Sequence, residues 1–187
     1  MSRPRNTTKM GSLADLPSSD SPSLGLVQAT DKEKEKTFRL NGASWRGALC
    51  ISDYLEREAH LGEQFLTRDG GITYWILVDT TLKADKRPIL ASCETLRKRA
   101  WIAKSGKIEE VVAHGIGSVF CNPKYRGRGY AKRMMAELGK KLETWQQPEG
   151  KKSMFSVLYS DIGKVSCLLM PTSSLHLKTN VALEILR

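Results

Sequence analysis

The chain reads Ser118-Val119-Phe120-Cys121-Asn122-Pro123-Lys124-Tyr125-Arg126-Gly127-Arg128-Gly129-Tyr130-Ala131 over residues 118–131, and this stretch decides the fold. It predicts a strand, a glycine-bearing loop and the first turn of a helix. The helix is expected because apolar residues recur every three or four positions, at Ala131, Met134, Met135, Leu138, Leu142 and Trp145. Pro148 and Gly150 should end it.

A strand, a glycine loop and a helix N-terminus together can bind an anion. The first N–H groups of a helix have no acceptor within the helix, and glycine lets the backbone approach a phosphate closely. Gly127 and Gly129 could equally serve turn geometry alone, and their spacing leaves both interpretations open. The three-glycine dinucleotide loop and the Gly-Lys-Ser/Thr loop of nucleotide-binding proteins are both missing. We therefore expect a phosphate-bearing cofactor of another kind.

The order Arg126-x-x-Gly129-x-Ala131, after a strand and before an amphipathic helix, resembles the acetyl-CoA-binding motif of the GNAT superfamily of N-acetyltransferases. Two further segments narrow this resemblance to the fungal lysine N6-acetyltransferase group, over roughly residues 24–164. They are residues 89–95, Ile-Leu-Ala-Ser-Cys-Glu-Thr, and residues 155–164, Phe-Ser-Val-Leu-Tyr-Ser-Asp-Ile-Gly-Lys. The likeness stops at Lys164, because residues 165–171 lack the aromatic pair that this group carries on its next helix.

The expected fold is α/β. Strands are predicted at residues 24–28, 72–79 and 89–96, the last continuing toward residue 103, and the latter two should form an antiparallel hairpin. Residues 31–36 could begin a helix or a loop, Asp53 and Glu56 suggest a helix cap, and residues 104–115 are expected to be flexible. Strand, crossover helix and the strand at residues 155–160 should make a parallel pair.

These elements agree with the GNAT-like mixed sheet that the resemblance implies: an antiparallel N-terminal part, a parallel pair, a crossover helix and an incomplete C-terminal part. Three regions are expected. Residues 1–22, rich in Ser and Pro, should be disordered, residues 23–164 should form the acetyltransferase domain, and residues 165–187 should be a divergent tail.

The resemblance implies that acetyl-CoA is a co-substrate and that an amine attacks its thioester directly. Backbone groups of Val119, Phe120 and Cys121 should align the pantetheine arm. The pyrophosphate should lie against the backbone of the loop residues Arg126, Gly127, Arg128, Gly129, Tyr130 and Ala131. Cys121 is expected to be a packing residue rather than a nucleophile.

An alkylammonium with a pKa of about 10.4 must lose a proton before it attacks, so a carboxylate or a water chain has to accept that proton. Glu94 and Asp161 are the candidates, and Tyr159 is the candidate acid for the departing thiolate. Each has a structural alternative: a solvated strand carboxylate for Glu94, a helix cap for Asp161 and a core residue for Tyr159.

Composition limits the other possibilities. The 187 residues carry a net charge of +10, suit one globular domain and include no apolar run of membrane-spanning length. The four cysteines are far apart and the histidines isolated, so no metal is expected. The single Arg-Gly-Arg-Gly segment favours a discrete phosphate site over nucleic acid. With no secretory signal, and a mitochondrial transit peptide disfavoured by Pro4 and Asp15, the cytoplasm is expected.

The predicted function is therefore transfer of acetyl from acetyl-CoA to a small-molecule amine, with the side-chain amine of lysine as the first candidate. The alternative is an impaired fragment that binds CoA, or anions such as RNA, without turnover. No membrane partner is expected, and the sequence gives no oligomeric state.

Overall fold

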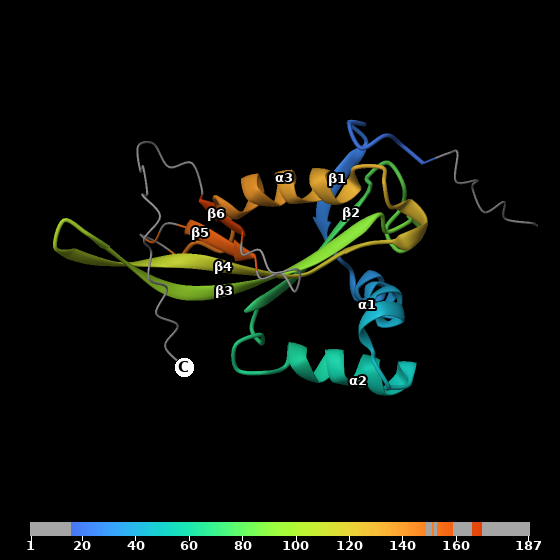
Figure 1. The fold of residues 1–187 in the computed structure, drawn as a ribbon, viewed down its shortest axis with the longest axis horizontal. Coiled ribbons are helices and arrows are strands. Elements are labelled where there is room, and N and C mark those ends of the chain that lie inside the picture. Colours follow the sequence, from blue (N-terminus) through green and yellow to red (C-terminus); the bar gives the residue numbers. More distant parts are fainter. Residues whose placement is uncertain (1–15, 149–150, 152, 159–165, 170–187) are drawn as a thin grey trace, which may run out of the picture.

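The structure is a computed structural model that describes residues 16–148, 151, 153–158 and 166–169. A six-stranded sheet has α1 and α2 on one face and α3 on the other (Figure 1). In chain order the elements are β1 (Leu24–Gln28), α1 (Asp31–Trp45), α2 (Ile51–Gly62), β2 (Ile72–Asp79), β3 (Ala91–Lys104), β4 (Lys107–Cys121), the 3-10 turn η2 (Pro123–Tyr125), α3 (Tyr130–Leu142), β5 (Ser153–Leu158) and β6 (Ser166–Leu169).

The strands follow one another across the sheet in the order β1-β2-β3-β4-β5-β6. The pairs β1–β2, β2–β3 and β3–β4 are antiparallel, β4–β5 is parallel, and β5–β6 is antiparallel. Helix α3 makes the crossover between the parallel strands, as such a connection requires. The predicted fold class is confirmed: a mixed sheet with an antiparallel N-terminal part, one parallel pair and a crossover helix.

The prediction of a flexible segment at residues 104–115 was wrong. The residues from Lys107 to Gly115, expected to be flexible, belong to β4, which pairs with β3 from Lys104↔Lys107 to Ala91↔Cys121. The strand is hard to recognise because its first residues are polar and exposed, and two glycines interrupt the later part of the pattern. Pairing along a long hairpin with β3 supplies the hydrogen bonds that local sequence preference does not indicate.

The ambiguous mixed-charge run at residues 31–36 begins helix α1. Thr30 caps this helix: its side chain accepts from the Glu33 N–H, and the Glu33 side chain accepts from the Thr30 N–H. Helix α2 begins at Ile51 and is capped by the Cys50 sulfur, so the cap expected at Asp53 is three residues late.

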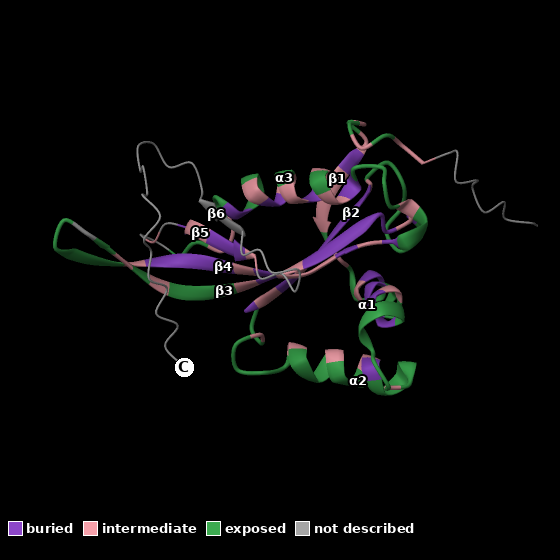
Figure 2. Ribbon diagram, in the orientation of Figure 1, coloured by how far each residue is buried: buried purple, intermediate pink, exposed green. Residues whose placement is uncertain are grey.

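The core lies on both faces of the sheet, and Figure 2 shows buried residues along the middle of β2 and β4. On the α3 face, Trp75 and Leu77 pack with Met134 and Leu138 of the helix. On the other face, Ile76 and Val78 pack with Ile89, and Leu40 of α1 covers them. The alternation along β2 thus places consecutive residues in different halves of the core.

Residues 16–22 lie against helix α3. This segment falls within the stretch expected to be disordered, residues 1–22. The Tyr130 hydroxyl donates to the Pro17 carbonyl at 2.6 Å, Arg133 Nη1 donates to the Ser19 carbonyl at 2.9 Å, and Leu16 packs against the core. These contacts offset the entropy of ordering a Ser/Pro-rich segment.

Among the described residues, no helix combines the length and the apolar character needed to cross a membrane.

Candidate active site

The loop between β4 and α3 has a backbone suited to an anion. The Asn122 side chain accepts from the Lys124 N–H at 3.1 Å and starts the 3-10 turn η2. Gly127 and Gly129 then adopt left-handed conformations, with φ of +79° and +82°. Gly129 is the N-cap of α3 and offers no side-chain hydrogen bond to the helix. The first turn of α3 contains no acidic residue, so its positive end is not neutralised from within the helix.

Space around the two glycines differs. A Cβ at Gly127 would have no heavy atom within 4 Å, whereas a Cβ at Gly129 would lie 2.9 Å from Ser19 Oγ. The loop is therefore open at Gly127 and covered by the N-terminal segment at Gly129. Arg126 folds back, donating from Nε to the Cys121 carbonyl at 3.2 Å, with its guanidinium 5.8 Å from the centre of the Phe120 ring.

Strand β4, which leads into the glycine loop, is irregular beside Glu94. Ser118 has a φ of +51°, and the register of β4 against β3 shifts between Ser92 and Glu94. The Ser118 hydroxyl donates to Glu94 Oε1 at 2.7 Å, and a Cβ at Gly117 would lie 3.2 Å from the same oxygen. Two consecutive residues of β4 thus face one carboxylate, which is the geometry of a β-bulge.

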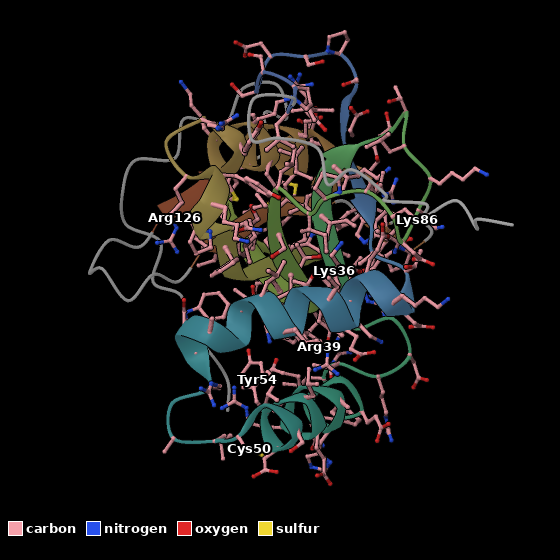
Figure 3. All side chains as sticks on the ribbon, turned by 90° about the vertical axis from the view of Figure 1, so that its right-hand side faces the viewer. Lys36, Arg39, Cys50, Tyr54, Lys86 and Arg126 are labelled. Carbon is pink, nitrogen blue, oxygen red and sulfur yellow. The ribbon has the colours of Figure 1, made fainter. Side chains whose placement is uncertain are left out.

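Burial raises the pKa of the Glu94 carboxyl; the hydrogen bond from Ser118 opposes this shift and the charge of Glu58 adds to it. Two tyrosines lie close by. Burial and then the charge of Glu94 raise the pKa of Tyr74 to about 12, and Tyr54, whose pKa is also raised by burial, lies between α2 and α1 (Figure 3). A partly buried carboxyl with a raised pKa can accept and release a proton closer to neutral pH than an ordinary glutamate.

The next three residues of β4, Val119 to Cys121, alternate between the two halves of the core. Val119 and Cys121 pack against the core on the α3 face, and Phe120 is buried with its ring 5.5 Å from that of Trp45, edge to face. Burial raises the pKa of the Cys121 thiol, although Arg126 acts in the opposite direction. A thiol that resists ionisation is a poor nucleophile, so this environment suits a packing cysteine.

The structure brings several of the predicted residues together along one path. The backbone of Val119, Phe120 and Cys121 leads directly into the loop from Arg126 to Ala131, and Glu94 lies at the bulge where this path begins. Tyr130 is buried in the core, so only its backbone can serve the loop. Tyr159 and Asp161 lie outside the described residues.

Sequence reasoning missed the side chains near Glu94: Asn41, Tyr74 and Ser118, which line one cavity with it, and Tyr54, on which its charge acts. Ser118 begins the quoted stretch, but nothing in the pattern marks a bulge there. Asn41 and Tyr54 reach the site only because α1 and α2 pack on this face of the sheet, which no local signal predicts. Within the described ranges, no group of three His, Cys, Asp or Glu side chains could hold a metal ion.

Known proteins include relatives of this chain in sequence. Over 118 residues, 62% of this chain, the sequence is 31% identical to a protein of Yarrowia lipolytica named lysine acetyltransferase. This match confirms the resemblance to the lysine N6-acetyltransferase group that the sequence motifs indicated. The chain is also 27% identical, over 156 residues, to the uncharacterized protein YGR111W of Saccharomyces cerevisiae. It spans 39% of the length of the Saccharomyces relative and 28% of the Yarrowia relative. No family model matches the chain.

Solved structures with a similar arrangement include acetyltransferases. Arabidopsis thaliana NAA60 in complex with acetyl-CoA is 14% identical, with a TM-score of 0.49 over 72% of this chain and 73% of that one. A predicted acetyltransferase from Clostridium acetobutylicum with acetyl-CoA is also 14% identical, with a TM-score of 0.49 over 75% of this chain and 84% of that one.

Proposed function

We propose that this chain is an acetyl-CoA-dependent N-acetyltransferase of the GNAT type, acting on the side-chain amine of lysine or a similar small amine. The observation that carries the proposal is the continuity of the site: the bulge at Ser118 and Glu94, the strand from Val119 to Cys121 and the open loop at Gly127 lie on one path. The name of the Yarrowia lipolytica relative supports lysine as the first acceptor to test.

Each part of the path has one task in this proposal. The loop backbone from Arg126 to Ala131 binds the pyrophosphate of acetyl-CoA at the N-terminus of α3, so binding energy from distant phosphates positions the thioester. Backbone groups of Val119 to Cys121 align the pantetheine arm and polarise the acetyl carbonyl. No metal takes part, and the cytoplasm remains the expected compartment.

Glu94 takes the proton in this scheme. The ammonium of the acceptor gives one proton to the Glu94 carboxylate, and the neutral nitrogen attacks the thioester carbon. A C–N bond forms, the C–S bond breaks with its electron pair on sulfur, and the thiolate is protonated as it leaves, for which Tyr159 remains the candidate donor. The attacking nitrogen loses a second proton as the amide forms; this proton replaces the one given to the thiolate, and the proton on Glu94 then passes to solvent.

Calorimetry and a thiol-release assay test this function. We expect acetyl-CoA to bind with an affinity that survives high salt, and Gly129→Glu to abolish that binding by placing a carboxylate in the loop. With lysine present, free thiol should appear. Glu94→Gln should lower kcat by about 100-fold while leaving acetyl-CoA affinity unchanged.

Two results would count against the proposal. Binding of acetyl-CoA without turnover of any amine would favour the alternative, a CoA-binding fragment. Loss of acetyl-CoA binding at high salt would indicate a nonspecific anion surface, whereas RNA that competes only at low salt leaves the cofactor site standing.

A further inference from the structure

A cleft lies between α1, α2 and the start of β2, on the same face of the sheet as Glu94. Its volume is about 580 Å³, within the range of small-molecule sites. Its lining includes Phe38 of α1, Glu58 and Glu63 of α2 and Tyr74 of β2. Five carboxylates line this cleft, and four of them form ion pairs, with Lys34, Arg39, Arg57 and Arg68. The fifth is Glu63.

A second, much smaller cavity adjoins the cleft. Its volume of about 10 Å³ suits one water-sized group, and its lining includes Asn41, Glu94 and Ser118. Phe38 and Tyr74 line both cavities, and their rings meet edge to face with centroids 5.4 Å apart. This pair of rings therefore borders both the cleft and the inner cavity.

Asn41, which lines the inner cavity, has a hydrogen-bond acceptor without a partner among the described residues. Asn41 is only 4% exposed, and within the described part of the chain its Oδ1 atom is buried and makes no hydrogen bond. A buried amide oxygen without a donor is destabilising, and such a group in a native protein calls for an explanation. Because Glu94 lines the same cavity, two oxygen-bearing groups converge on a space that fits one small donor.

The chemistry of that donor follows from these oxygens. A primary ammonium has three N–H donors and no acceptor, so it complements an amide oxygen together with a carboxylate. An uncharged hydroxyl or methyl group would leave one or both oxygens unsatisfied or the carboxylate uncompensated. The cavity also adjoins Ser118 at the bulge, where the proposed path of the thioester begins.

We infer that Asn41 is the residue that selects a primary amine as acceptor, with its Oδ1 accepting a hydrogen bond from the ammonium that Glu94 deprotonates. The aliphatic part of the acceptor lies in the cleft against Phe38 and Tyr74. This inference rests on the proposed function and adds to it the residue that recognises the reacting nitrogen.

The test replaces Asn41 by Leu, which has nearly the same shape and no acceptor. We expect Asn41→Leu to raise the KM for lysine at least about tenfold and to leave acetyl-CoA affinity unchanged. Because the substitution removes a buried polar group without a partner, Tm should stay equal or rise, which shows that the variant folds. Asn41→Asp keeps an oxygen at this position and should retain lysine binding.

Thr37→Val is the matched control on the same helix. Thr37 also lines the inner cavity, but its hydroxyl has a partner, the Glu33 carbonyl at 2.9 Å, whereas within the described residues Asn41 Oδ1 has none. This isosteric change should leave the KM for lysine within about twofold, a difference too small to represent a lost charged hydrogen bond. An equal rise in KM for both variants would show a packing effect and overturn the inference.

A binding experiment separates this inference from the proposed function. In the presence of CoA, calorimetry compares lysine with norleucine, which has the same carbon chain without the side-chain amine. Lysine should bind at least about tenfold more tightly to the wild type, and Asn41→Leu should remove that preference. If lysine binds in this way but no acetyl is transferred, the inference stands and the proposed function fails. If acetyl is transferred and Asn41→Leu behaves as wild type, or lysine does not bind, the inference fails.

Discussion

Gly127 adopts a φ of +79°, a region that an L-residue enters only with strain, and it lies in the open part of the proposed pyrophosphate loop. Gly127→Ala should therefore lose about 1 kcal/mol of stability from the backbone alone. It should also weaken acetyl-CoA binding by roughly tenfold or more, because a methyl group and a shifted backbone disturb the approach to the phosphates. Urea unfolding and calorimetry measure the two effects.

Gly106→Ala is the matched control for Gly127→Ala. Its φ of +75° is nearly the same, and a Cβ there would likewise have no heavy atom within 4 Å, but it lies in the turn between β3 and β4. Figure 1 shows this turn at the end of the molecule opposite the start of α3. Gly106→Ala should lose similar stability and keep full acetyl-CoA affinity. Equal weakening in both variants would mean that the loop at Gly127 does not bind the cofactor.

At the scale of elements, the start of α1 depends on a buried ion pair. Glu33 is 1% exposed, and its Oε1 atom accepts from Arg87 Nε at 2.8 Å and from the Asp85 N–H at 3.2 Å. Burial acts to raise the pKa of Glu33, but the hydrogen bonds from Arg87, Thr30 and Asp85 outweigh it and hold that pKa below its usual value. The carboxylate therefore ties α1 to the loop before β3.

Arg87→Met should destabilise the protein by about 3–5 kcal/mol, because it leaves the Glu33 charge buried without its cation. The comparison is Arg39→Met on the same helix. Arg39 pairs with Glu35 at 2.7 Å, but both side chains are more than half exposed, and this change should cost less than about 1 kcal/mol. Chemical unfolding of the two variants measures the difference. Similar losses of stability would show that the buried Glu33–Arg87 pair contributes no more than the exposed Glu35–Arg39 pair.

Sequence patterns predicted the elements well where one face is buried and the period is regular. Helix α3 follows this rule, since Met134, Leu138 and Leu142 recur on the side that packs against the sheet. The first half of β4 does not: its polar residues are held by pairing with β3, a long-range effect that local periodicity cannot report. The start of α1 was ambiguous because the alternating charges of residues 31–36 show no apolar period, although Thr30 and Glu33 form a capping box there.

At the scale of the whole molecule, the loop was easier to predict than the rest of the site. Gly127 and Gly129 act through backbone conformation, which a contiguous motif encodes. The surroundings of Glu94 come from separate elements: Asn41 on α1 and Ser118 on β4 line one cavity with it, and its charge acts on Tyr54 of α2. Their meeting depends on how two helices pack on the sheet and on one bulge, so it requires the folded arrangement rather than a motif.

Protonation of His114 makes the stability of the whole fold depend on pH. It is fully buried in β4, with Nδ1 3.3 Å from Ser153 Oγ of β5, and within the described residues its Nε2 atom has no hydrogen-bond partner. Burial, and then the charge of Arg97, lower its pKa to about 4 from an ordinary value of 6.5. The unfolded chain therefore binds a proton between these pH values that the folded chain does not. This contribution to stability is complete above pH 6.5 and is lost as the pH falls toward 4.

From this residue alone, the free energy of unfolding should be about 2 kcal/mol lower at pH 5 than at pH 7.5. His114→Gln should remove that part of the pH dependence, whatever it does to stability at pH 7.5, because glutamine does not titrate. Urea unfolding of the wild type and His114→Gln at both pH values gives the comparison. If the wild type and His114→Gln lose stability equally between pH 7.5 and pH 5, then the imidazole is hydrated in solution and the parallel β4–β5 pair is looser than its packing here indicates.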